Sequence, residues 1–267
     1  MSNFNDIISV LDTINKENVV SVYVPSLKKD VKFKGFTTGQ QKLFLKAAVD
    51  NPVFQTRFII ACYTLLQENC LEKEALAAFT ALDGAAILIQ LRVSVYGKDF
   101  EMEDNNEAYK IDLTQIIEKV KALDIPAHKT INEGAFNIVV GAPSLYEQYS
   151  LEKQVRGKNL ENEQTPTQNI NDTIGEAFIG EVSKYIKDID INVNGEVTNI
   201  NYSGLPFTKK HQVLEKLPTS VVKGVITYIE TITTLQKQLL TVTGTKVTDS
   251  STKDVELTLN SALFAIG

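Results

Sequence analysis

The chain has 267 residues and a formal net charge of −6. Hydrophobic residues make up 43% of it and charged residues 22%, which is typical of a globular protein with enough apolar material for one large domain or two smaller ones. The negative charge argues against a general binder of nucleic-acid backbones, because such proteins are basic. No stretch has the roughly 18 consecutive apolar residues of a membrane span. The N-terminus lacks the pattern of a signal peptide.

The first part of the chain predicts an amphipathic helix followed by a β-hairpin. The helix is expected from Asn5 to Lys16. In the first strand, Val22 and Val24 alternate with more polar residues, which is typical of a strand with one buried face. A polar, turn-prone connection leads to a second strand that contains Val31 and Phe33.

Two helices are expected after this hairpin. Thr38 and Gln41 have the spacing of a capping box, in which each side chain bonds the backbone N–H of the other residue. Pro52 suits the first turn of the next helix, because that position needs no N–H donor. This second helix, Val53 to Gln67, is apolar on most faces and is therefore expected to be buried.

The next stretch predicts two further helices. The first, Leu71 to Leu82, is expected to break at Asp83 and Gly84. Asp83 then caps a second helix, Ala85 to about Val95. Arg92 near the end of that helix leaves two interpretations open. It is either a solvated side chain or a cation well placed for the helix dipole, or else one half of a buried ion pair that orients its neighbours.

The middle of the chain alternates polar and apolar segments. Gly97 to Tyr109 is acidic and predicts a turn or a short mobile hairpin. Asp112 is expected to cap a helix that ends at Pro126, and His128 to Val140 is expected to be extended. A further helix should begin after Ser144.

Gly157 to Asp172 predicts a linker or loop, because it is poor in hydrophobic residues and rich in Asn and Gln. This places the boundary between two lobes. The N-terminal lobe, residues 1–156, contains a hairpin and helices, and the C-terminal lobe, residues 173–267, has a helix–hairpin–helix order. The C-terminal lobe is expected to begin with a long helix from Ile174 to Lys187.

Asn194 and Gly195 are the clearest turn signal in the chain. Both residues adopt positive φ at low cost, so they predict a two-residue hairpin turn. The register that follows pairs Val193 with Glu196, Ile191 with Thr198, and Ile189 with Ile200.

The rest of the chain predicts helices and then strands. One helix is expected from Phe207 to Leu217, a second begins at Pro218, and the segment after Thr241 is β-rich. A hairpin, a Phe-Thr pair, a helix, a proline and a second helix occur in this order twice in the chain. Together the elements predict an α+β fold that is mostly helical, with two β-hairpin–helix modules and a C-terminal strand.

The sequence offers few residues for catalysis. His128 and His211 have no spaced Cys or His partner for a zinc site, and surface positions are expected for both. Cys62 and Cys70 are the only cysteines, and Cys62 is expected to be a buried free thiol. The chain has no phosphate-binding Walker loop and no nucleophile elbow. The acidic residues between Glu101 and Glu107 suit either a hard cation or a solvated loop.

The N-terminal hairpin is the candidate docking element. Lys28 and Lys29 lie at its tip, and further lysines follow in the second strand. These charges either meet an acidic partner or serve solubility and block edge pairing. A two-stranded ribbon is marginal alone and needs a surface to pack against. The predicted partner-docking residues are Val22, Val24, Lys28, Lys29, Val31 and Phe33.

Four stretches, in their order along the chain, resemble the T4-type myovirus baseplate hub and hub-assembly family. They are VPSLKKDVKFKGFTTGQQKLFLKA, ALDGAAILIQLRVSVYG, FNIVVGAPSLYEQYSLEK and DVELTLNSALFAIG. Members of this family often carry a cysteine-containing segment after the helix that ends in Leu-Arg. Here Lys98 to Asn106 contains no cysteine, so a metal ribbon is not expected at this position.

The resemblance implies a non-enzymatic structural or assembly component of a contractile phage tail baseplate that docks on hub or wedge subunits. It also implies a virion protein of the tail baseplate that is assembled in the host cytoplasm and needs no cofactor. The residues by themselves leave two alternatives open. One is a non-viral adaptor or an accessory subunit of an enzyme complex, and the other is a hydrolase that uses scattered carboxylates.

Overall fold

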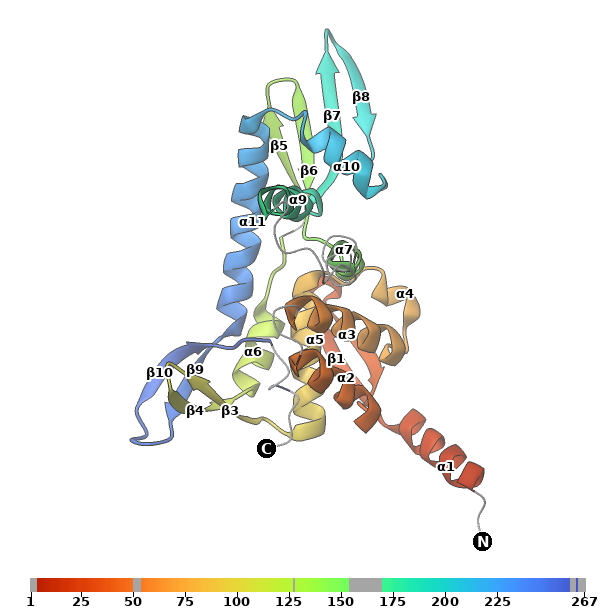
Figure 1. The fold of residues 1–267 in the computed structure, drawn as a ribbon, viewed down its shortest axis with the longest axis vertical. Coiled ribbons are helices and arrows are strands. Elements are labelled where there is room, and N and C mark those ends of the chain that lie inside the picture. The colour runs from red at the N-terminus through yellow and green to blue at the C-terminus, as the bar shows by residue number, and fades with distance from the viewer. Residues whose placement is uncertain (1–3, 50–53, 127, 154–169, 260–262, 264–267) are drawn as a thin grey trace. The chain divides into compact units, whose positions relative to one another are not determined.

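The computed structural model describes residues 4–49, 54–126, 128–153, 170–259 and 263 (Figure 1). The chain divides into two compact units. Unit 1 comprises Met1–Asp124 and Lys237–Gly267, and unit 2 comprises Ile125–Gln236. Unit 1 is therefore built from both ends of the chain, and unit 2 is inserted between them.

Unit 1 contains a hairpin, several helices and a four-stranded sheet. Its N-terminal part runs α1 (Phe4–Glu17), β1 (Val19–Val24), a 3₁₀ turn η1 (Pro25–Leu27), β2 (Lys29–Lys34), α2 (Thr38–Val49), α3 (Phe54–Asn69), α4 (Lys73–Leu76), α5 (Ala81–Tyr96), β3 (Asp99–Asp104), β4 (Glu107–Asp112) and α6 (Thr114–Ala122). Its C-terminal part contains β9 (Thr241–Lys246) and β10 (Thr252–Glu256).

Unit 2 contains a second four-stranded sheet with helices. Its order is β5 (Lys129–Glu133), β6 (Phe136–Val140), α7 (Leu145–Leu151), α9 (Ile170–Ser183), β7 (Ile186–Val193), β8 (Glu196–Ile200), α10 (Phe207–Leu214) and α11 (Thr219–Leu240). The last residues of α11, from Lys237, belong to unit 1.

The described residues mix helices with three antiparallel sheets, which confirms the predicted α+β class. One sheet is the two-stranded pair β1–β2, and the four-stranded sheets have the orders β10-β9-β4-β3 and β5-β6-β7-β8. The structure has more strands than the two hairpin–helix modules and C-terminal strand of the predicted fold, and the hairpin at residues 97–109 is one of the two alternatives predicted there. The two acidic or polar segments at residues 97–109 and 128–140 each form a hairpin, because asparagines or a glycine at their turns accept positive φ.

The N-terminal hairpin forms as predicted. Antiparallel pairing sets Val22 opposite Val31 and Val20 opposite Phe33. The capping box at the start of α2 lies one residue earlier than predicted. The Thr37 hydroxyl accepts from the N–H of Gln40 at 3.3 Å, and the Gln40 side chain accepts from the N–H of Thr37 at 3.1 Å.

The predicted helix break at Asp83 and Gly84 is wrong. Helix α5 runs without interruption from Ala81 to Tyr96, and α4 covers only Lys73–Leu76 of the preceding predicted helix. Thr80 is the N-cap, and Asp83 completes a capping box three residues later. Every residue from Leu82 to Arg92 is buried, so packing offsets the cost of roughly 1 kcal/mol that a glycine within a helix carries.

The C-terminal strands complete the sheet of unit 1. Strand β9 pairs with β4, with Lys110 opposite Thr245, and β10 pairs with β9. The contact is close at Gly244, where an added Cβ atom would lie 3.1 Å from the Cβ of Tyr109. This sheet therefore joins segments from the two ends of the chain.

The hairpin at Asn194 and Gly195 has the predicted register. Val193 pairs with Glu196, Ile191 with Thr198, and Ile189 with Ile200, while the two turn residues have φ of 54° and 88°. This hairpin is part of a four-stranded sheet, unlike β1–β2, which forms a two-stranded sheet.

Several helix ends differ from the sequence predictions. Helix α9 covers Ile170–Ser183, so the last residues of the predicted linker are helical and β7 begins at Ile186. Helix α10 ends at Leu214, and α11 extends to Leu240. Residues 154–169, which hold most of the predicted linker, and Pro52 lie outside the described residues. The predicted lobe boundary therefore stays a prediction, although residues 237–267 group with unit 1 rather than with the rest of residues 173–267.

Candidate docking surfaces

The apolar residues of the predicted docking element are part of the core of unit 1. Val22, Val24, Val31 and Phe33 are each 0% exposed. Strand β1 packs against α5 and α6, and the ring of Phe33 lies 6.2 Å from that of Phe79. These four side chains hold the hairpin in place. The part of the predicted site that remains on the surface is its lysine-bearing tip.

Two buried polar side chains of α5 attach the hairpin to the helix. Asp83 Oδ1 accepts from the N–H of Ser26 in the turn at 2.9 Å. The Gln90 side chain accepts from the N–H of Tyr23 at 3.0 Å and donates to its carbonyl at 2.8 Å. The Gln90 side chain thus bonds the N–H and C=O groups of Tyr23 at the edge of β1, as a neighbouring strand would. The sequence prediction missed this role of both residues, although a single glutamine within an apolar helix is a recognisable signal.

The hairpin lysines pair with acidic residues of unit 1. Lys28 Nζ lies 3.1 Å from Asp124 Oδ1, and both side chains are more than 70% exposed. Lys29 Nζ lies 2.9 Å from Glu72 Oε2. The hydrogen bond from Lys29 lowers the pKa of Glu72, and a bond from the Lys32 N–H adds to this effect. Exposed pairs of this kind contribute only about 0–1 kcal/mol, so these lysines can exchange their acidic partners at small cost.

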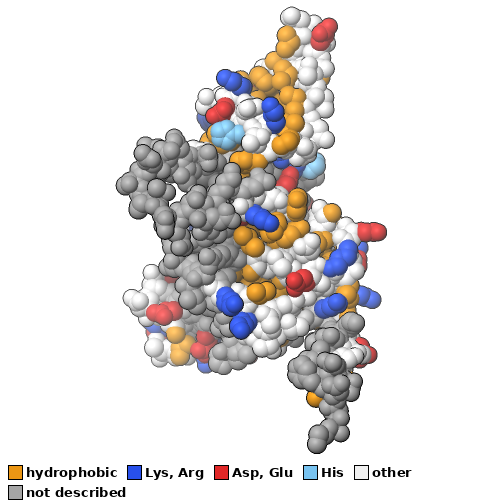
Figure 2. All heavy atoms as spheres, turned by 45° about the vertical axis from the view of Figure 1, so that its right-hand side comes forward, with side chains coloured by type: hydrophobic (Ala, Val, Ile, Leu, Met, Phe, Trp, Pro, Cys, Tyr) orange, Lys and Arg blue, Asp and Glu red, His pale blue; other side chains and the backbone are white. Residues whose placement is uncertain are grey.

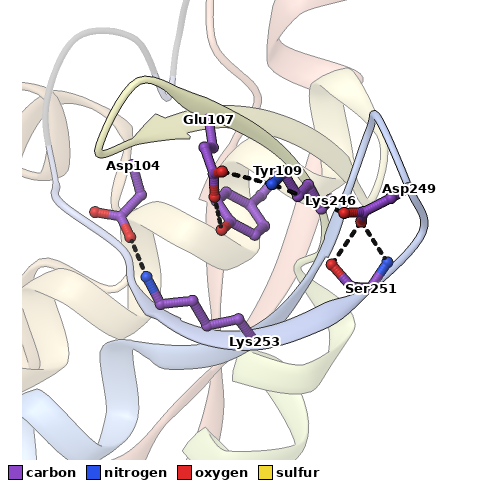
Figure 3. Close-up of polar contacts among 7 residues, drawn as sticks. All are labelled: Asp104, Glu107, Tyr109, Lys246, Asp249, Ser251 and Lys253. Atoms are coloured by element: carbon purple, nitrogen blue, oxygen red, sulfur yellow. Dashed lines mark hydrogen bonds and ion pairs between the residues drawn. The ribbon is translucent and has the colours of Figure 1, made fainter.

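The acidic segment between Glu101 and Glu107 forms charge pairs across the sheet of unit 1 (Figure 3). Asp104 Oδ2 lies 3.0 Å from Lys253 Nζ of β10. Glu107 pairs with Lys246 of β9 and accepts from the Tyr109 hydroxyl at 2.8 Å. The bond from Lys246 lowers the pKa of Glu107.

These pairs change the interpretation of the acidic segment. The segment belongs to two ordered strands. Lysines of the C-terminal strands, rather than a bound cation, neutralise its carboxylates Asp104 and Glu107. Among the residues that the structure describes, no group of three or more His, Cys, Asp or Glu side chains could hold a metal ion.

The histidines and cysteines lie in separate surroundings. His128 is exposed and lies against Gly141, where an added Cβ would be 2.4 Å from the imidazole Cδ2. His211 is half-buried, with Nδ1 3.5 Å from Glu215 Oε1 and its ring beside Phe207. Cys62 and Cys70 are free and buried, and burial raises the pKa of both thiols.

Arg92 is not solvated, but it does lie near the C-terminal end of α5, where a cation suits the helix dipole. Its side chain is buried and donates to the carbonyl oxygens of Gly97, Asp99 and Leu263. The guanidinium carbon lies 5.5 Å from the centre of the Phe100 ring. Burial lowers the pKa of Arg92. The arginine therefore satisfies backbone carbonyls at the end of α5 and near the C-terminus.

Among the described residues, α1 and the β7–β8 hairpin each carry more than one large apolar side chain that is well exposed. On α1 four of them, spaced as one face of a helix, are 47–58% exposed: Ile7, Val10, Leu11 and Ile14. On the β7–β8 hairpin, Val193 is 59% and Val197 62% exposed. Figure 2 shows hydrophobic side chains along the hairpin at the top of the view. Such side chains mark surfaces that are suited to association.

The described residues define an α+β protein with ordered charge pairs and exposed apolar faces. A family model described as T4 bacteriophage base plate protein matches residues 16–259, which include the hairpin and both four-stranded sheets. The chain belongs to this family and is a component of a phage baseplate, which confirms the resemblance to a T4-type baseplate protein. Comparison with curated proteins and with solved structures gives no match.

None of the described helices is both long enough and apolar enough to span a membrane.

Proposed function

We propose that this protein is a non-enzymatic structural or assembly component of a contractile phage tail baseplate that docks on hub or wedge subunits. The family match over residues 16–259 carries the proposal. The exposed apolar face of α1 and the lysine-bearing hairpin tip support it, because both offer contacts to other proteins. On this proposal the protein is present at the tail baseplate of the virion after assembly in the host cytoplasm.

The hairpin tip is the proposed site of electrostatic contact with a hub or wedge subunit. Asp83 and Gln90 hold the backbone of the hairpin, so the tip presents its charges from an ordered support. Lys28 and Lys29 are exposed, and the ion pairs that they form with Asp124 and Glu72 lie at the surface. An acidic patch on a partner can therefore replace these acidic neighbours without disturbing the core.

Charge reversal tests this contact. We expect the double variant Lys28→Glu, Lys29→Glu to keep its thermal stability nearly unchanged, because exposed charges contribute little to folding. Its capture of hub and wedge proteins in pull-downs should fall several-fold at low salt, where charges are least screened. Lys216→Glu with Lys223→Glu is the matched control, since it changes two exposed lysines of unit 2. Unchanged capture at low salt by the hairpin variant would exclude this docking face.

The absence of catalysis has its own test. Simultaneous alanine replacement of His128, His211, Cys62 and Cys70 should leave phage assembly largely intact in a variant that folds, because these residues have no catalytic role in the proposal. Circular dichroism checks the fold. Complete loss of assembly in a well-folded variant would contradict the proposal that the protein is not an enzyme. Mass spectrometry of purified virions tests separately whether the protein remains in the baseplate.

A further inference from the structure

The outer edge of β8 has no pairing strand among the described residues. In the order β5-β6-β7-β8 it is the terminal strand, and its first four residues are exposed. The opposite edge strand, β5, has α11 beside it (Figure 1). There the side chain of Ile131 packs on Gly224, where an added Cβ would lie 2.8 Å from Ile131 Cγ2. Strand β5 therefore has a helix against its central side chain and is otherwise exposed, whereas the first four residues of β8 are all exposed.

The register of the hairpin shows which backbone groups of β8 point outward. In a two-residue hairpin the pair beside the turn exchanges backbone hydrogen bonds, and such pairs alternate with pairs that do not. Glu196, Thr198 and Ile200 therefore bond to β7. The neighbouring strand agrees, because the N–H of Asn192, which lies opposite Val197, donates to Ala135 on the β6 side at 2.8 Å. The N–H and C=O groups of Val197 and Asn199 are consequently directed to the free edge.

Strand β8 lacks the features that usually block edge pairing. Natural edges carry prolines, lysines, bulges or inward-pointing charges. The sequence Glu-Val-Thr-Asn-Ile has one charge, at its first position, and its pairing with β7 is regular. The irregularity that the sheet does contain lies in another pair, between β6 and β7 at Val139 and Val140.

We propose that the β8 edge pairs antiparallel with the β8 edge of a second copy of this chain. With Thr198 at the two-fold axis, Val197 of each copy lies opposite Asn199 of the other, and the four outward groups of each strand find partners. Glu196 then lies opposite Ile200, so no like charges face each other. An antiparallel pair with equal charges opposite would be destabilised. This self-complementarity favours a second copy over an unrelated strand.

The contact is small and is expected to be weak in dilute solution. Five residues of edge strand bury much less than the roughly 1,600 Å² of total area that is standard for a stable interface. Pairing should therefore matter where copies are held at high local concentration. The test accordingly uses a covalent trap on the full-length protein rather than an affinity measurement.

Disulfide trapping of Thr198→Cys tests the pairing and its register. The Cβ atoms of residues opposite each other in a pair without hydrogen bonds are about 4.5–5.5 Å apart, close enough for a disulfide after small movement. The native thiols of Cys62 and Cys70 are buried and should stay unreacted. Under mild oxidation we expect at least tenfold more covalent dimer than from Thr130→Cys, an exposed threonine on the opposite edge strand.

A second substitution separates strand pairing from random collision. Val197→Pro removes an outward N–H without breaking a bond to β7, so it should abolish most of the trapping by Thr198→Cys. Asn199→Pro removes the other outward N–H. It is the variant to use if Val197→Pro does not fold. Circular dichroism checks the fold. Equal trapping at residues 130 and 198, or trapping that survives the proline, would overturn the proposal. Homodimer trapping that disappears when another baseplate protein is added would assign the edge to that protein instead.

Discussion

Asp83 shows how one buried residue supports both the hairpin and a helix. Its side chain is 0% exposed. Oδ1 accepts from the N–H of Ser26, while Oδ2 accepts from the N–H and hydroxyl of Thr80 at 2.6 and 2.8 Å. Both oxygens of a carboxylate accept hydrogen bonds, whereas the amide of Asn, which has the same size, has one accepting oxygen. The start of α5 and the turn of the hairpin therefore depend on the same group.

Replacing Asp83 by alanine should destabilise unit 1 by about 2–4 kcal/mol, because buried donors lose their acceptor. Asp83→Asn keeps one oxygen acceptor and should cost less. Urea unfolding measures both, and Asp254→Ala, at an exposed position, is the control. A loss in Asp83→Ala no larger than in the control would mean that these bonds do not stabilise the unit.

Asp112 should titrate at unusually low pH. A hydrogen bond from Lys98 Nζ at 2.6 Å and bonds from Thr114 lower its pKa from 3.8 to about 2. Because the folded-state pKa is depressed, the ionised group stabilises the fold above its unfolded value, and this stabilisation is lost as the pH falls from about 4 to about 2. Carbon-detected NMR of the carboxylate should show this midpoint. Lys98→Ala should raise it, and a wild-type midpoint near 3.8 would contradict the assignment.

At the scale of the element, the two hairpins are stabilised in different ways. The β1–β2 pair has its apolar face buried and one backbone edge bonded by Gln90. The outer part of β7–β8 is exposed, and its register depends on the turn at Asn194 and Gly195 and on pairing with β6. The β1–β2 hairpin is therefore suited to hold the lysines of its tip in place. The β7–β8 hairpin leaves backbone groups of β8 available for pairing.

Two glycine-to-alanine changes should have opposite effects. Gly195 has φ of +88°, so Gly195→Ala introduces strain and should destabilise the hairpin by about 1 kcal/mol. Gly39 lies in α2, where an added Cβ would lie 3.8 Å from the Thr37 hydroxyl, an ordinary van der Waals distance. Gly39→Ala should therefore stabilise the protein by up to about 1 kcal/mol. Amide hydrogen exchange in β8 and in α2 measures each effect. Equal signs at the two positions would contradict the prediction.

At the scale of the whole molecule, the fold closes unit 1 with the C-terminal strands. Val242, Val255 and Leu257 are each at most 2% exposed. The Gln115 side chain exchanges two hydrogen bonds with the backbone of Thr243, both of 3.0 Å. The N-terminal residues of unit 1 can therefore reach their complete fold only after the entire inserted unit has been synthesised.

Truncation after Leu240 should prevent unit 1 from folding stably. Each buried aliphatic side chain that is lost contributes roughly 1.5–3 kcal/mol, so the sum approaches the roughly 5–15 kcal/mol stability of a typical domain. Hydrogen exchange should show loss of protection in β3 and β4 and retention in β6 and β7. Full protection of β4 in the truncated chain would show that the C-terminal strands are dispensable.

The predicted linker at Gly157 to Asp172 remains a proposal that rests on composition. Limited proteolysis of the isolated protein should cut this segment first, because it is poor in hydrophobic residues. Peptide mapping by mass spectrometry locates the first cut. First cleavage at a loop elsewhere in the chain, with residues 157–169 intact, would remove the predicted boundary between the lobes.

Local chemistry in the sequence determined several features of this protein. The alternation in the first hairpin placed Val22 and Val24 on the buried face, and Asn194 with Gly195 set the register of the second hairpin. These signals are reliable because turn geometry and strand periodicity act between residues close in sequence. The lysines at the hairpin tip were likewise found at the surface.

Tertiary structure decided the rest, because contacts between distant residues have no local signal. The pairing of β9 with β4 makes unit 1 discontinuous, and it brings Lys246 to Glu107 and Lys253 to Asp104, which are 139 and 149 residues apart. Asp83 looked like a helix break but meets Ser26, 57 residues away. Packing against those distant partners overrode the local tendency of Asp-Gly to form a turn, and it decided which carboxylates became structural pairs.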